Sequence, residues 1–166
     1  HSLRILGSLR EKMLFAQNFR QSIPPSRLLI DAQYRLVLTD YANSEIRLRP
    51  LEKALFLLYL NHPEGIYMSS LCEHREELYH YYTSLSGMGE AIEMRERIDE
   101  MTNALSDSAS QKMARIKRVF EEAIGTQLAC HYYKQGKNGT QKKIKLDRSM
   151  VEGPGTNIFL NKKNNI

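Results

Sequence analysis

The chain has 166 residues, of which 42% are hydrophobic and 26% are charged, and its net charge is +5. These values are ordinary for a soluble globular protein of one domain, with or without appendages. No apolar run approaches the roughly 20 residues that cross a bilayer, and the N-terminus lacks the pattern of a secretory signal. The two cysteines, Cys72 and Cys130, have a spacing that suits neither a metal site nor a disulfide framework. We therefore expect a cytoplasmic protein without membrane contact.

Residues 3–20 have the spacing of an amphipathic helix. Apolar side chains follow one another at intervals of three, four and three, as in a coiled-coil seam, at Leu6, Leu9, Met13 and Ala16. Such a helix packs on the chain's own core, relays a signal from an upstream domain, or forms a homodimer. The sequence predicts three parts: an N-terminal helix that serves as linker or dimerisation element (1–22), a main domain (23–148) and a flexible C-terminal tail (149–166).

Three short strands are predicted after the break at Pro24 and Pro25. They cover Arg27–Ile30, Tyr34–Thr39 and Glu45–Leu48. Apolar residues alternate along the last two, which is typical of a sheet with one buried face. The intervening turns contain Asp, Asn and Ser, which favour turns. We therefore expect a small antiparallel sheet ahead of the helices.

A capped amphipathic helix is predicted to begin at Pro50. Proline is favoured at the first helical position because the N–H that it lacks has no partner there. Glu52 places a negative charge at the positive end of the helix dipole. Apolar residues then recur at helical spacing and predict one buried stripe: Leu51, Ala54, Leu55 and Leu58. Pro63 and Gly65 are expected to lie beyond its end.

Three further helices are predicted, and the charge changes sign between them. They cover Met68–Ser84, the acidic segment Glu90–Leu105 and the basic segment Gln111–Ile124, which Gly125 ends. Residues 64–107 contain three basic and ten acidic residues, whereas residues 108–148 contain ten basic and three acidic residues. Clustered Lys and Arg are typical of a phosphate-binding surface. A solvated surface with uneven charge is the alternative interpretation.

The basic helix has an apolar face and a polar face. The apolar face combines Met113, Ile116, Phe120 and either Ala123 or Ile124. The opposite face carries Gln111, Arg115, Arg118 and Glu122, with Lys112 and Lys117 on its flanks. Arg and Gln side chains read base edges through paired hydrogen bonds, whereas Lys side chains neutralise phosphates. The pattern therefore favours a nucleic-acid contact, although an ordinary solvated face has the same composition.

A β-hairpin is predicted after the basic helix. Its strands would be Leu128–Gln135 and Lys142–Leu146, on either side of Gly136–Gly139, and Asn-Gly is a strong hairpin signal. Five lysines surround the turn: Lys134, Lys137, Lys142, Lys143 and Lys145. The sequence thus predicts a basic hairpin beside a basic helix.

Two stretches of the chain resemble the DNA-binding domain of OmpR/PhoB-type response regulators. The first helix of that family opens with Leu-Thr-Pro-x-Glu and closes with Asn-Pro-Gly, and Leu48–Glu52 and Asn61–Gly65 stand in those places. The family's recognition helix carries an apolar-x-x-apolar-Arg-Arg motif, and a hairpin with a Gly-rich turn follows it. Met113–Arg118 and Gly136–Gly139 correspond to these two features. The resemblance extends from Leu28 to Asp147.

The resemblance implies an α+β fold, namely a winged helix-turn-helix with a small N-terminal antiparallel sheet, a helical core and a C-terminal β-hairpin wing over residues 23–148. It also implies a transcriptional regulator that reads double-stranded DNA through the helix Gln111–Ile124 and the basic wing. The expected DNA-binding residues are Gln111, Lys112, Arg115, Lys117, Arg118, Lys134, Lys137, Lys142 and Lys143. In the family the loop before the recognition helix can contact RNA polymerase, so RNA polymerase or another regulatory protein is a second candidate partner.

Two departures from the family pattern bear on these expectations. Arg49 stands where the family has its capping Thr, and the acidic helix Glu90–Leu105 lengthens the connection ahead of the basic helix. The alternative function is a winged-helix module for protein–protein interaction that does not bind DNA. In that case the acidic helix would dock on a basic partner or mask the chain's own basic helix.

No catalytic, metal or cofactor site is expected from the sequence. His74 and His80 are six residues apart, which is off the i, i+4 pairing of a helical zinc site, and His62 lies far from both in sequence. The chain has neither a phosphate-binding Gly-rich loop nor a Gly-x-Ser-x-Gly motif. We therefore expect a protein that is not an enzyme and needs no cofactor.

Overall fold

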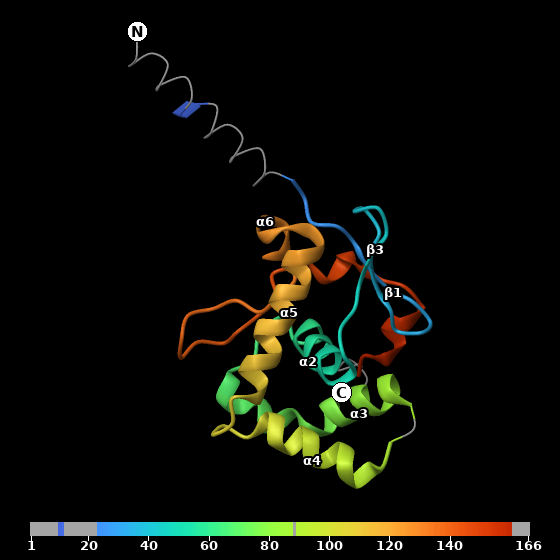
Figure 1. Cartoon of the computed structure of the whole chain (residues 1–166), viewed down its shortest axis with the longest axis vertical. Helices are drawn as coiled ribbons and strands as arrows, with labels where there is room; N and C mark the ends of the chain where they lie inside the picture. Colours follow the sequence, from blue (N-terminus) through green and yellow to red (C-terminus); the bar gives the residue numbers. More distant parts are fainter. Residues whose placement is uncertain (1–9, 12–22, 88, 161–166) are drawn as a thin grey trace.

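The computed structural model describes residues 10–11, 23–87 and 89–160. This part of the chain is a mixed α+β fold, in which a four-stranded sheet lies beside a group of helices (Figure 1). The predicted α+β class is thus confirmed. The N-terminal helix predicted over residues 3–20 lies outside the described residues, apart from Arg10 and Glu11. Within the described ranges, no helix combines the length and the apolar character needed to cross a bilayer.

Three of the four strands form the predicted antiparallel sheet. Strands β1 (Leu28–Ile30), β2 (Leu36–Leu38) and β3 (Ser44–Ile46) pair in chain order. Alternate residues of β2 are fully buried, as the alternation of the sequence predicts for a sheet with one buried face, and alternate residues of β1 are fully buried too. The fourth strand, β4 (Val151–Glu152), pairs in parallel with β1 and completes the order β3-β2-β1-β4. The sequence did not predict β4, because a strand of two residues is too short to show an alternation of apolar and polar residues.

The segment after residue 148 differs from the flexible tail that was predicted. Residues 148–160 form the 3-10 helix η2 (Arg148–Met150), then β4, then the 3-10 helix η3 (Pro154–Ile158). Glycine is required here for close packing: a Cβ on Gly153 would lie 2.4 Å from the Ile30 carbonyl oxygen, and one on Gly155 would lie 2.3 Å from that of Asp31. The sequence interpretation took these glycines as markers of a loop, whereas they let the chain approach β1.

The helices follow the predicted order with shifted boundaries. They are α2 (Pro50–Leu60), the 3-10 helix η1 (Met68–His74), α3 (Arg75–Ser86), α4 (Ala91–Thr102), α5 (Ser108–Ile124) and α6 (Thr126–Ala129). The predicted helix over Met68–Ser84 is therefore a 3-10 turn followed by an α-helix. The basic helix begins three residues earlier than predicted, and α6 replaces the start of the predicted hairpin.

Helix α2 lies at the centre of the molecule, with α5 crossing it and α3 and α4 beneath (Figure 1). Every residue from Ala54 to Leu60 is buried, so the helix is covered on all sides rather than along the single predicted stripe. Leu51, which belonged to that stripe, is only half-buried. A helix that is apolar all round is typical of the middle of a core.

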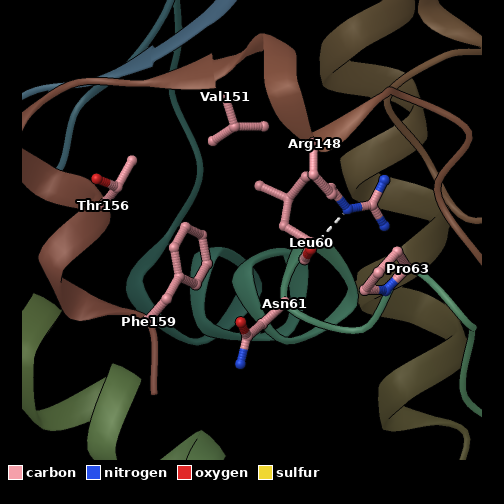
Figure 2. Close-up of a pocket in the computed structure, with 7 residues that line it drawn as sticks. All are labelled: Leu60, Asn61, Pro63, Arg148, Val151, Thr156 and Phe159. Atoms are coloured by element: carbon pink, nitrogen blue, oxygen red, sulfur yellow. Dashed lines mark hydrogen bonds between the residues drawn. The ribbon is translucent and has the colours of Figure 1, made fainter. Parts of the chain in front are cut away.

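Arg148 closes the C-terminal end of α2 (Figure 2). Its guanidinium donates to the carbonyl oxygens of Leu60 (2.6 Å) and Tyr59 (3.0 Å), and also to those of Ile144 (2.9 Å) and Leu146. The last carbonyls of a helix have no partner within the helix and carry its negative dipole end, so a cation is favoured there. Burial lowers the pKa of Arg148. Arg148 also lines a hollow with Asn61 and Phe159. The guanidinium beside this hollow is therefore already hydrogen-bonded to the carbonyl oxygens.

Candidate nucleic-acid interface

The apolar face of α5 fixes which way the helix presents its charges. Met113, Ile116 and Phe120 are buried, as their spacing predicts, and so is Ala109, which precedes the predicted start of the helix. At the end of this face Ile124 is half-buried, whereas Ala123 is exposed. Phe120 lies between two other rings: its centroid is 5.5 Å from that of Phe56 in α2 and 5.2 Å from that of Tyr132, on which it stacks. With this face held against α2, the opposite face of α5 points away from the core.

The outer face of α5 is open over most of its length. Gln111, Ala114, Lys117, Arg118 and Glu122 are exposed. The ammonium of Lys117 lies 5.3 Å from the centre of the Tyr133 ring and 3.9 Å from Glu121. Arg118 takes part in no ion pair among the described residues. A guanidinium and an amide on one exposed helical face can donate to base edges or phosphates.

Arg115 is not free on this face, contrary to the sequence interpretation. Its Nε lies 2.8 Å from one carboxylate oxygen of Glu52 and 3.1 Å from the other. The side chain of Glu52 is only 4% exposed, so the pair joins the start of α2 to the middle of α5. Glu52 was predicted as a helix-dipole residue, and nothing in its spacing indicated a contact 63 residues away. Arg115 therefore joins α5 to α2 through this ion pair and is not available to bind DNA while the pair is intact.

The acidic helix α4 does not cover the Arg118 face. It packs mainly along α3, where Arg95 pairs with Glu76 (2.9 Å). Near the start of α5 it borders a polar hollow that Gln111 and Lys112 also line. Lys112 is half-buried there and donates to Ser108 (2.8 Å). The acidic helix therefore flanks the N-terminal end of α5 and leaves Arg118 exposed.

The predicted hairpin is reduced to a loop held by two isolated bridges. Gln135 pairs with Lys143, and Lys142 pairs with Ile66, a residue between α2 and η1. Residues 126–129, which overlap the first predicted strand, are α6 instead. The loop 136–141 projects from the body beside α5 (Figure 1). The helix and the basic loop thus lie on the same side of the molecule.

Two of the predicted wing lysines point inward. Lys142 is buried, and its ammonium donates to the carbonyl oxygens of Gly136 (2.5 Å) and Lys137 (2.6 Å), so it closes the loop. Lys134 is half-buried, with its ammonium 3.6 Å from the sulfur of Met68. Burial, assisted by the charge of Lys142, lowers the pKa of Lys134. Both were expected to bind DNA, and both are placed as supports of the loop.

The exposed cations that remain form a smaller set, which we call the basic face. It consists of Lys117 and Arg118 on α5, Lys137 on the loop and Lys143 just after it, with Gln111 as an exposed amide. Comparison of the chain with protein-family models, curated proteins and solved structures finds no match. The function is therefore argued from the geometry of the chain itself.

Proposed function

We propose that the protein is a DNA-binding transcriptional regulator of the winged helix-turn-helix type, with α5 as its recognition helix. The observation that carries the proposal is the basic face: its cations on α5 and near the loop are exposed, and the loop 136–141 lies beside α5 (Figure 1). Clustered cations that replace counterions are the main source of affinity for a duplex. Arg118 and Gln111 would reach into the major groove, and Lys137 would contact the backbone.

The chain order around the loop supports the same type of fold. In a winged helix a short strand between the first two helices pairs with the second strand of the wing, which pairs with the first. Here Ile66 follows α2 and pairs with Lys142, and the adjacent Lys143 pairs with Gln135. Each of these two pairings is a single β-bridge rather than a strand ladder. It nevertheless ties the loop to the segment that joins α2 and α3, and so fixes its position beside α5.

Charge-matched variants provide the test of DNA binding. Arg118→Gln, Lys137→Gln and Arg35→Gln each remove one positive charge, and Arg35 lies in the β1–β2 turn, paired with Asp31 (2.6 Å). In fluorescence-anisotropy titrations with mixed duplex DNA, Arg118→Gln should cost about 1–3 kcal/mol for a bidentate base contact. Lys137→Gln should weaken binding uniformly and reduce the salt slope by about 1. Arg35→Gln should bind as the wild type does. No binding at low salt, or an equal loss in all three variants, contradicts the proposal.

Release of Arg115 should strengthen DNA binding. Glu52→Gln removes the carboxylate that holds the guanidinium at 2.8 Å, and Arg115 lies on the same helix as Arg118. We expect a severalfold gain in affinity at low salt, as for roughly one added phosphate contact, and a stability loss of about 1 kcal/mol. The gain should vanish in the Arg115→Gln background, which separates release of Arg115 from a mere change in net charge. An equal gain in both backgrounds would show that Arg115 plays no part.

One observation favours the protein-interaction alternative. Ile92 and Leu105, near the two ends of α4, are 75% and 95% exposed, the largest values among the large apolar side chains of the described residues. If the anisotropy titrations show no DNA binding at low salt, binding of a partner protein to α4 becomes the better-supported function. Leu105→Ser would then weaken the binding of that partner and leave the fold intact.

A further inference from the structure

Three side chains of the kinds that ligate metals meet between the end of α2 and the first turn of α3. They are His62, just after α2; His74, the last residue of η1; and Glu77, in the first turn of α3. Their ligating atoms all lie within 4.8 Å of one another. The side chains of His62 and Glu77 are only 5% and 12% exposed, and the His62 and His74 rings meet edge to face with centroids 4.8 Å apart. None of these three residues belongs to the basic face.

The groups around the cluster orient its ligands. His62 Nδ1 lies 3.1 Å from a carboxylate oxygen of Glu64, and His62 Nε2 lies 2.9 Å from Oε1 of Glu77. The other oxygen of Glu77, Oε2, accepts from the Tyr81 hydroxyl (2.7 Å) and the Asn61 amide (3.0 Å). A histidine whose second nitrogen is held by a carboxylate, facing a carboxylate that is itself hydrogen-bonded, is the usual surrounding of a protein metal ligand.

We propose that His62, His74 and Glu77 form a zinc site, with water as the fourth ligand. Two imidazole nitrogens and one carboxylate oxygen are a donor set that Zn²⁺ accepts, whereas Mg²⁺ and Ca²⁺ require mostly oxygen. The ion takes the position between His62 Nε2 and Glu77 Oε1, and the proton shared by these atoms is released to solvent. Small side-chain rotations bring the three ligand atoms to about 2.0–2.2 Å from the metal.

The site would clamp the segment between α2 and α3. His62 is anchored to the end of α2, while His74 and Glu77 belong to successive helices, so one ion would tie the three elements together. A ligand that binds only the folded chain raises its stability by mass action. Zinc should therefore raise the melting temperature of the full chain. The proposal does not depend on DNA binding, because neither Arg118 nor Lys137 takes part in the cluster.

Calorimetric titration of the metal-free full chain with zinc chloride tests the proposal. A non-thiol reductant keeps both cysteines reduced. We expect one zinc ion per chain and a higher melting temperature in its presence. X-ray absorption of the zinc-loaded wild type should show only nitrogen and oxygen neighbours at about 2.0–2.2 Å. Absence of one-to-one binding, or a sulfur neighbour in the absorption spectrum, would overturn the proposal.

Substitutions locate the ion. His74→Ala should weaken zinc binding more than about 100-fold, since loss of an outer partner alone costs about 10–100-fold. Glu64→Gln, a change in a positioning residue, should weaken it about 10-fold. Cys72→Ser is the matched control: Cys72 is exposed and lies two residues before His74, and its removal should leave the affinity unchanged. Wild-type affinity in a folded His74→Ala protein, or loss of binding in Cys72→Ser, contradicts the proposed ligands.

Discussion

Replacement of Arg148 by Met should destabilise the protein by about 3–5 kcal/mol. Met keeps most of the side-chain volume but removes the guanidinium N–H donors to the carbonyl oxygens of Tyr59, Leu60, Ile144 and Leu146. These carbonyls lie around the partly buried Arg148 side chain at the end of α2, where lost hydrogen bonds are costly. Because the stability of a domain is only about 5–15 kcal/mol, urea unfolding should show a much lower midpoint.

Two further variants separate charge from geometry at this position. Arg148→Lys keeps the cation, but a single ammonium cannot reach acceptors on both α2 and the 144–146 segment, so an intermediate loss is expected. Arg35→Gln removes a guanidinium whose ion pair, within the described residues, is with Asp31 on an exposed turn, and it should change stability by less than about 1 kcal/mol. If Arg148→Met unfolds at the wild-type urea concentration, Arg148 does not clamp the end of α2.

The elements that were predicted correctly are those whose determinants lie close together in sequence. Pro50 at the first helical position and the apolar residues after it define α2, and its predicted beginning is the observed one. Strands β2 and β3 were found from alternation, and the turns on either side of β2 separated the three strands β1 to β3. The buried face of α5 followed from its 3.6-residue period. In each case one short window contains the information.

The features that were missed depend on contacts between distant segments. Arg115 and Lys142 have the sequence environment of exposed cations, but Glu52 and the carbonyl of Gly136 engage them in the folded chain. The glycines at 153 and 155 resemble a loop, but they pack against β1. The histidines of the proposed zinc site share no helical spacing, because a 3-10 turn and the packing of α2 on α3 bring them together. No single window of sequence specifies these contacts.

Removal of the Phe120 ring should have the second large effect, and it connects the core to the proposed DNA-binding surface. The ring is fully buried between Phe56 of α2 and Tyr132, which leads into the basic loop. Phe120→Ala should cost about 3–5 kcal/mol in urea unfolding, because it removes apolar contacts and leaves a cavity. Phe120→Leu keeps most of the volume and should cost less than about 1.5 kcal/mol.

The same ring links α5 to the segment that leads into the loop, since Phe120 belongs to α5 and stacks on Tyr132, a few residues before the loop. Phe120→Leu loses the stacking on Tyr132 while the chain remains folded. We therefore expect it to weaken DNA binding although Phe120 itself is buried and cannot touch a duplex. Tyr132→Phe serves as the control, because it keeps the stack and removes only the hydroxyl that donates to the Ser26 carbonyl (2.7 Å). Wild-type DNA affinity in folded Phe120→Leu would show that the loop and helix act independently, and the single continuous basic surface would then be wrong.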